Sequence, residues 1–413
     1  MSTPVHTSPA LRRTGLEAVL GFAWRSGAFT AGEAMESVPL TRSTTIDVID
    51  ELTGRGILRE LANARVTGGY RKGRPARRFE LRSDAGVVVG VDAGRAHLTA
   101  TVADLRGTAL LTVRAELRAD DESAEARADA TQALIDDALA TAGIGRDAVI
   151  AVCLGVPAPV DAGGDSPPHP TGFWWRMNPG FVEQFARWAP VVRVENDASL
   201  AAIAERSLGA AIAEDDFVTL LAGERLGAGI CVDGRLLRGA HGGVGEMDAF
   251  TRVDGVGGAW GLAYRTAEWA REAVAAGGLP EGSRLADLAV DDMDARLVLS
   301  LAAAGDPGAV LVARRVGELL AVVAGVLAGL FDSRLIVVAG GVAEGAGPVI
   351  DAARTALSAA TDLPAPRLVA STLGADVVST GAVAAAVESA RARLLDLPRF
   401  AVSATDGADA ATV

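Results

Sequence analysis

The feature that most restricts the fold of this 413-residue chain is a strand pattern that occurs twice. Short apolar segments separated by glycine turns form a three-strand meander over 87–94, 99–107 and 110–113. A looser copy follows over 217–221, 229–234 and 235–238. Strand meanders that are each followed by helical segments predict a duplicated, two-lobed α/β body. Ligands of such folds bind between the lobes, beyond the ends of the strands.

The first 82 residues carry a different pattern, in which three short helices precede two strands. An amphipathic helix is expected over 11–26, and Thr30-Ala-Gly-Glu33 has the form of a capping box that starts a second helix. Pro39 ends that helix, and Thr41 is the expected cap of a third. In the third helix a shared core face is expected for Thr45, Val48, Ile49 and Leu52. This order predicts a winged helix-turn-helix, whose third helix enters the major groove of DNA.

The opposite face of the third helix supplies the candidate base contacts. Arg42 and Ser43 stand near its N-terminus, where they can reach phosphates or base edges. Ile46, expected to be exposed, can meet a thymine methyl group, and Asp47 can accept a hydrogen bond from cytosine N4. The candidate DNA contacts on this helix are Thr41, Arg42, Ser43, Thr44, Ile46 and Asp47.

Two short strands, expected over 57–60 and 79–81, enclose a basic segment that forms the predicted wing. Five of the nine residues over 70–78 are Lys or Arg, and Gly-Arg-Pro at the tip is slim enough for the minor groove. The candidate phosphate contacts are Arg71, Lys72, Arg74 and Arg77, with Arg78 beside them. The alternative is a solvated basic loop with no nucleic-acid role.

Charge is distributed unevenly along the chain. The net charge is −13, but residues 1–82 hold 13 Lys and Arg against 8 Asp and Glu, which gives +5 there and −18 over the remainder. A basic head on an acidic body is expected of a DNA reader joined to a sensor. Chance surface charge remains the alternative explanation.

Other bulk features indicate a soluble, cytoplasmic protein. No apolar run reaches the ~18 residues of a membrane span, and the first nine residues lack the pattern of a signal peptide. Two cysteines, Cys153 and Cys231, lie in apolar strand-like segments and cannot by themselves form a disulfide framework or a zinc site.

A series of short motifs resembles, in order and spacing, the regulator branch of the ROK family (repressors, open reading frames and sugar kinases). The resemblance covers roughly residues 11–390. Its motifs in the head are 40–45, 50–52, 56–60 and 73–75, and those in the body are 92–94 with Asp104 and Gly107, 155–161, 195–198, 227–230, 238–239, 243–246 and 339–342.

The resemblance implies an actin-like ATPase fold, in agreement with the duplicated meander. It also implies sugar contacts from Asn196, Asp197 and Glu246, with Asp197 at the position of the general base of the kinase members. Asp248 and Asn178 are further candidate ligand contacts, and Trp174, Trp175 and Trp260 either line the site or are core or interface aromatics. The alternative for Asn196 and Asp197 is a turn and helix N-cap, and both roles can coexist.

The chain departs from the family where phosphate and zinc would bind. The first phosphate turn of the kinase members, Asp-x-Gly-Gly-Thr-Lys, is replaced by residues 92–97, and the second, Gly-Thr-Gly, by residues 223–225, which include Glu224 and Arg225. The histidine of the family's zinc site is replaced by Ala249, and the cysteine cluster falls in 255–262, which has none. We therefore predict no zinc, no cofactor and no catalytic residues.

Together these observations predict a winged helix-turn-helix over 1–82, a first lobe over 83–206 completed by a C-terminal helix over 376–398, a second lobe over 207–375 and a disordered tail over 399–413. The expected function is a transcription regulator, a homodimer or homotetramer that binds operator DNA, represses carbohydrate-related genes and senses a sugar or sugar derivative. The alternatives are an active sugar kinase with a DNA-binding head and a ligand-blind DNA-binding protein.

Overall fold

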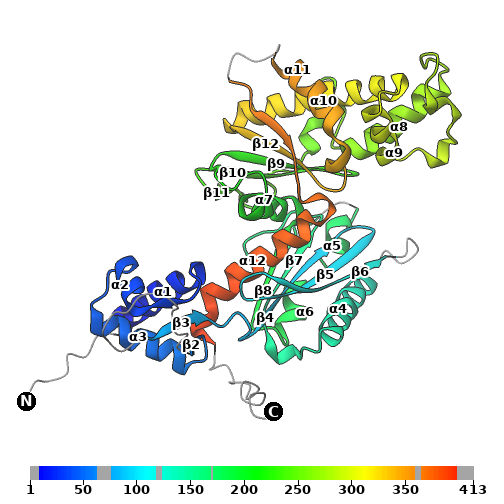
Figure 1. Cartoon of the computed structure of the whole chain (residues 1–413). Helices are drawn as coiled ribbons and strands as arrows, with labels where there is room; N and C mark the ends of the chain where they lie inside the picture. The colour runs from blue at the N-terminus through cyan, green and yellow to red at the C-terminus, as the bar shows by residue number, and fades with distance from the viewer. Residues whose placement is uncertain (1–8, 63–75, 118–122, 169–170, 359–363, 398–413) are drawn as a thin grey trace, which may run out of the picture.

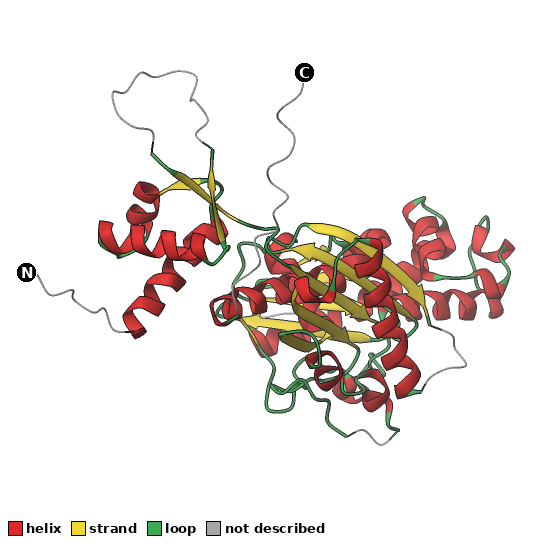
Figure 2. Ribbon diagram, turned by 90° about the horizontal axis from the view of Figure 1, so that it is seen from below, coloured by secondary structure: helices red, strands yellow, loops and turns green. Residues whose placement is uncertain are grey.

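The computed structural model describes residues 9–62, 76–117, 123–168, 171–358 and 364–397. The chain begins with a small unit of three helices and a three-stranded antiparallel sheet, which we call the head (Figures 1 and 2). The elements of the head are α1 (Pro9–Arg25), β1 (Phe29–Thr30), α2 (Ala31–Ser37), α3 (Arg42–Gly54), β2 (Leu58–Leu61) and β3 (Arg78–Leu81).

Local hydrogen bonds explain where the helices of the head begin. The capping box predicted at the start of α2 is present: Glu33 N–H donates to Thr30 Oγ1 at 3.3 Å, and Thr30 N–H donates to the Glu33 carboxylate at 2.6 Å. Thr41 caps α3, as predicted, by accepting from Thr44 N–H. The predicted core face is confirmed as well, since the buried residues of α3 are Thr45, Val48, Ile49 and Leu52.

The rest of the chain, which we call the body, contains two five-stranded mixed sheets with one topology. In each, the first strand is central, the second and third lie on one side, and the fourth and fifth lie on the other. The shared strand order of the two sheets confirms the predicted duplication and the mixed α/β class. The first sheet comprises β4 (Val87–Ala93), β5 (His97–Asp104), β6 (Ala109–Glu116), β7 (Val149–Val156) and β8 (Val191–Asn196). The second comprises β9 (Phe217–Ala222), β10 (Leu226–Val232), β11 (Arg235–Leu236), β12 (Leu335–Ala339) and β13 (Arg367–Ala370).

Helices cover these sheets and connect them (Figure 1). With the first sheet are α4 (Ala124–Thr141), α5 (Phe173–Met177) and α6 (Phe181–Ala186). With the second are α8 (Leu262–Ala275), α9 (Ala295–Ala303), α10 (Pro307–Phe331) and α11 (Gly347–Ser358). Helices α7 (Asp197–Leu208) and α12 (Val377–Arg393) lie between the two lobes, and α12 is followed by a single 3-10 turn, η7 (Leu394–Asp396).

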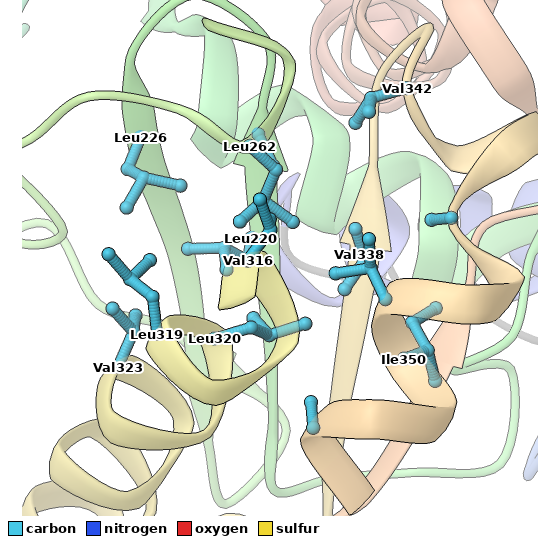
Figure 3. Packing of buried hydrophobic residues seen from close by; sticks show 14 of the residues in the cluster. Leu220, Leu226, Leu262, Val316, Leu319, Leu320, Val323, Val338, Val342 and Ile350 are labelled. Carbon is cyan, nitrogen blue, oxygen red and sulfur yellow. The ribbon is translucent and has the colours of Figure 1, made fainter. Parts of the chain in front are cut away.

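The second lobe has the largest hydrophobic core. Leu220 and Val338 from its sheet meet Val316, Leu320 and their neighbours on the buried face of α10 (Figure 3). Burying such side chains stabilises the fold by roughly 1.5–3 kcal/mol each. No described helix is long and apolar enough to cross a membrane.

Helix α12 joins the body to the head. It packs against α7, β4 and β7. At its far end, Leu395 O accepts a hydrogen bond from Arg55, the C-cap residue of α3, at 3.1 Å, and Asp396 pairs with Arg13 of α1. One continuous hydrophobic cluster therefore runs from α1 and α3 of the head into α12 and the first sheet.

Arg106 makes a second connection between body and head. It stands in the turn between β5 and β6, and its guanidinium donates to the carbonyls of Trp24 at 3.0 Å and Ser26 at 2.7 Å. These carbonyls end α1 and have no partner within that helix. The first lobe thus supplies the C-terminal cap of a head helix.

Several strands differ from the sequence prediction in their bounds or were not predicted, and β1 and β10 are two examples. The two-residue β1 was not predicted because it is too short to show an alternating pattern. Strand β10 begins at Leu226 rather than at Gly229, and its glycines Gly227 and Gly229 lie close to α7. A Cβ atom on Gly229 would lie 2.2 Å from Ala198 O of α7. The tail predicted over 399–413 lies outside the described residues.

Glycine contacts between α7 and α12 give a stability prediction. A Cβ atom at position 381 would lie 2.0 Å from Leu200 O, so Gly381→Ala must push α12 away from α7. We expect this substitution to lower the free energy of unfolding by about 1–3 kcal/mol.

The matched control is Gly329→Ala in α10, where a Cβ atom would meet nothing within 4 Å. That substitution should raise the free energy of unfolding by about 0.4–1 kcal/mol, because alanine has less freedom to lose on folding. Denaturant titration of both variants checks the pair. Equal effects would contradict the proposed close packing.

Candidate functional site

The head presents the start of α3 to solvent. Arg42, Ser43 and Asp47 are exposed, as expected for groups that meet DNA. Ile46, which was expected to be exposed, is only partly exposed, and Thr44 is partly buried as well. The partial burial of Ile46 leaves a smaller surface for a thymine methyl group.

The hydroxyl groups at this helix start are partly used within the protein. Thr41 Oγ1 lies 2.8 Å from Thr44 Oγ1 and 3.2 Å from Ser43 Oγ, in addition to capping the helix. Each hydroxyl has both a donor and acceptor sites, so a phosphate oxygen could still accept from this cluster. Thr41 and Thr44 therefore have a structural role that exists without DNA.

Arg77 is held by the head itself. Its guanidinium pairs with Asp50 of α3 at 3.0 Å and with Glu60 of β2 at 2.8 Å, and it lies 4.9 Å from the centre of the Phe79 ring. These carboxylates raise the pKa of Arg77. Arg77 thus ties the base of the predicted wing to α3. Three further predicted contacts, Arg71, Lys72 and Arg74, lie outside the described residues.

The second candidate site lies between the lobes, where α7 begins. Asn196 Oδ1 accepts from Ser199 N–H at 3.0 Å, and its Nδ2 donates to Ala158 O at 3.2 Å. Asp197 Oδ1 accepts from Ala198 N–H at 2.7 Å. The N-cap role that was the alternative for this pair is therefore present. It leaves the second carboxylate oxygen of Asp197 for another donor.

Four carboxyl groups from both lobes influence one another here. The pKa of Asp197 is raised to about 7, mainly because the carboxyl is buried and in part because Asp92 and Glu246 place negative charge nearby. Burial also raises the pKa of Glu246, with Asp248 adding to the effect and Arg225 opposing it. The predicted ligand residues Asp197, Glu246 and Asp248 are thus brought together. Donors such as sugar hydroxyls suit this set.

Asn178 belongs to a different set of contacts. It is buried, and its Nδ2 donates to Gly164 O at 2.9 Å and to Ser166 Oγ at 3.0 Å. Its Oδ1 is buried without a hydrogen-bond partner in the described part of the chain. The geometry gives Asn178 a role in holding the loop at 164–166, and a ligand contact from it would have to be made through Oδ1.

The two altered phosphate turns meet in space. Arg95 of the first turn pairs with Glu224 of the second at 3.0 Å. His97 Nε2 lies 3.1 Å from Asp92 Oδ2, which raises the pKa of His97. Behind them Arg127 is buried and donates to the carbonyls of Ala93, Gly94 and Met177. Sequence reasoning identified the altered turns but neither the Arg95–Glu224 pair nor Arg127.

The segment that replaces the family's zinc loop is held by a guanidinium group. Arg265 is buried, and it donates to the carbonyls of Val256, Gly258 and Trp260. The described residues contain no group of three or more His, Cys, Asp or Glu side chains placed to hold a metal ion. The residues of this loop do not fit the family's zinc. Cys153 and Cys231 are buried free thiols elsewhere.

The candidate aromatic residues are divided between two places. Trp260 stacks on Tyr264, with ring centres 4.3 Å apart, and the Arg225 guanidinium lies 5.6 Å from the centre of the Trp260 ring. Arg225 also pairs with Asp248 at 2.9 Å, so this aromatic pair adjoins the carboxylate cluster. Trp174 is partly buried against the first lobe's core, and Trp175 on α5 is exposed.

The raised pKa of Asp197 predicts how stability depends on pH. Folding makes this carboxyl hold its proton more tightly, so stability should fall as pH rises from about 4, near the unfolded pKa, to about 7. Asn at this position cannot ionise and can still accept from Ala198 N–H. We expect Asp197→Asn to raise the free energy of unfolding at pH 8 by about 1–3 kcal/mol and to change it little at pH 4.

Denaturant titrations at both pH values check this. The control is Asp137→Asn, which removes an exposed carboxylate of α4 and should leave the pH dependence of stability as in the wild type. A uniform effect of Asp197→Asn at pH 4 and pH 8 would contradict the burial argument.

Comparisons with known proteins agree with this architecture. The bifunctional enzyme NanE/NanK of Brucella suis is 36% identical over 199 residues, which cover 45% of this chain and 33% of that protein. The xylose repressor of Caldicellulosiruptor bescii is 25% identical over 215 residues, 51% of each protein. The chain thus spans between a third and about half of the length of these curated relatives.

Solved structures extend the similarity. A ROK family transcriptional regulator described as a homologue of the E. coli MLC protein superposes with a TM-score of 0.74 at 21% identity, covering 93% of this chain and 98% of that one. A ROK family glucokinase from Streptomyces griseus, in complex with glucose and AMPPNP, gives 0.59 at 28% identity, covering 73% of this chain and 100% of that one. The sequence model described as "ROK family" matches residues 88–388. Because that match spans most of its length, the chain belongs to the ROK family.

Proposed function

We propose that this protein is a DNA-binding transcription regulator, a repressor of carbohydrate-related genes, whose ROK body senses a sugar or sugar derivative without phosphorylating it. The observation that carries the proposal is a small helical head, with the start of α3 exposed, joined rigidly to a ROK body. The xylose repressors among the relatives support it, although each is matched over about half of its length.

In this proposal the head is a winged helix-turn-helix. Helix α3 enters the major groove, with Arg42 and Ser43 at its leading end and Asp47 one turn later. The two strands β2 and β3 lead to the wing, whose basic residues neutralise phosphates. Arg77 orients the wing against α3 through Asp50 and Glu60 rather than binding a phosphate itself.

The body responds to its ligand through α7 and α12. A sugar bound by Asp197 and Glu246 would contact the first turn of α7, which packs along α12, and α12 holds α1 and α3 at its other end. A ligand that favours one arrangement of the lobes would thereby favour one placement of the heads in a homodimer or homotetramer. By linkage, operator DNA would change the affinity for the ligand by the same factor.

The main alternative is an active sugar kinase with a DNA-binding head. The pKa of Asp197, at about 7, suits a general base, and kinase members are among the structural relatives. Against it stand Glu224 and Arg95, which place an ion pair where the resemblance puts the phosphate turns. Release of ADP from ATP with a panel of monosaccharides, compared between wild type and Asp197→Asn, distinguishes the two: turnover that requires Asp197 would favour the kinase.

A ligand-blind DNA-binding protein is the second alternative. Thermal unfolding with glucose, xylose and N-acetylmannosamine tests it, since a ligand that binds the folded state raises the melting temperature. Replacing Glu246 by Gln should abolish any such rise if the carboxylate cluster is the binding site.

DNA binding itself is tested with operator fragments selected from random duplex DNA by the full-length protein. We expect Arg42→Ala to weaken binding by about 1–3 kcal/mol and to relax the preference at one base position, because a base contact is lost. Arg74→Ala should lower the affinity for all DNA sequences. It should also make the affinity depend less steeply on salt concentration, by the amount that corresponds to about one lost phosphate contact.

The matched control is Arg314→Ala, which removes an exposed arginine from α10 of the body. It should leave both affinity and salt dependence unchanged. If wild-type protein shows no salt-sensitive affinity for any duplex, the regulator assignment is wrong.

A further inference from the structure

Two ion pairs of different character connect the lobes. The first joins Arg238, which follows β11 in the second lobe, to Glu195 of β8 in the first. Glu195 is buried, and it accepts from Arg238 through both carboxylate oxygens and also pairs with Arg193. A network of this kind resists salt, because water and ions have little access to it.

The second pair, Arg95 with Glu224, is exposed on both sides. The side chains keep 54% and 58% of their surface accessible, so salt can screen the attraction. The two residues are 129 positions apart in the sequence and belong to the two turns that depart from the kinase pattern. The first departure introduces Arg95 and the second introduces Glu224 together with Arg225; Arg225 pairs with Asp248, and the opposite charges of Arg95 and Glu224 meet at 3.0 Å.

The turn that carries Glu224 is held in place from behind. Gly261 N–H donates to Glu224 O at 2.8 Å, and a Cβ atom on Gly261 would lie 2.0 Å from Gly223 O. Gly261 ends the loop that Arg265 binds through three carbonyls. On the other side, Arg127 fixes the turn of Arg95 by donating to Gly94 O at 3.0 Å. Both partners of the pair therefore stand on immobilised backbone.

From these observations we propose that Arg95 and Glu224 form an interlobe clasp, which holds the lobes together in the absence of any nucleotide. In the kinase members both turns bind the phosphates of a nucleotide, whereas in this chain the two turns contact each other directly. The body then closes on its ligand alone, and a nucleoside triphosphate would have to break the clasp and place its phosphates beside Glu224. The proposal concerns the body and stands whether or not the head binds DNA.

The test measures the distance between the lobes in the full-length protein. Cysteines introduced at Asp137 in α4 and at Glu281 in the second lobe carry a donor and an acceptor dye, while Cys153 and Cys231 stay buried and unlabelled. Arg95→Glu and Glu224→Arg each bring two like charges together. Each should lower the ratio of closed to open molecules by about two- to fivefold. The combined reversal, Arg95→Glu with Glu224→Arg, should restore it.

Salt and a matched variant complete the test. Raising NaCl from 50 to 500 mM should increase the distance between the lobes in the wild type and in the double reversal, because salt screens the attraction between the two side chains. In the single reversals the two side chains repel each other, so the same salt should bring the lobes slightly closer. Arg314→Glu makes the same charge change in the exposed Arg314–Glu318 pair within α10 and should leave the distance distribution unchanged. The clasp would be overturned if both single reversals left the interlobe distance unchanged. It would also be overturned if the double reversal failed to restore the wild-type distance.

Discussion

The packing of α12 is the constraint on which the rest of this structure depends. Its first half lies against α7 so closely that Gly381 touches the carbonyl of Leu200, a contact that no side chain permits. Its last residues and η7 bind α1 and α3 of the head. Because α12 packs against α7 and is followed by residues that bind the head, this helix connects the body directly to the head.

Several carboxylates at the junction of the lobes are paired with cationic side chains. Arg225 with Asp248, His97 with Asp92 and Arg95 with Glu224 each offset a carboxylate at the junction of the lobes. Asp197 and Glu246 share this junction, and the pKa of both is raised by burial. With a pKa of about 7, the Asp197 carboxyl is partly protonated near neutral pH and can donate as well as accept a hydrogen bond. This dual capacity suits the hydroxyl groups of a sugar better than it suits an anion.

Local features of the fold could be predicted from the sequence, and contacts between distant segments could not. The Thr30–Glu33 capping box and the core face of α3 depend on residues three or four apart, so the periodic pattern identified them. The duplicated meander was visible because each copy repeats apolar segments and glycine turns. Arg95 and Glu224 are 129 positions apart and meet only because two lobes close. The hydrogen bonds of Arg106 and Arg265 could not be predicted from the sequence either. Their acceptors are main-chain carbonyls, which every residue carries.

Arg106 has a consequence for how such proteins can be recombined. Because an arginine of the first lobe completes the end of α1, the head is joined to the body by specific contacts and not only by the connecting chain. A chimera that joins this head to a foreign sensor would expose the last carbonyls of α1 and part of its apolar surface. Under the proposed function, exchange of DNA specificity between relatives should therefore proceed by changing the few residues at the start of α3, with the contacts between head and body kept intact.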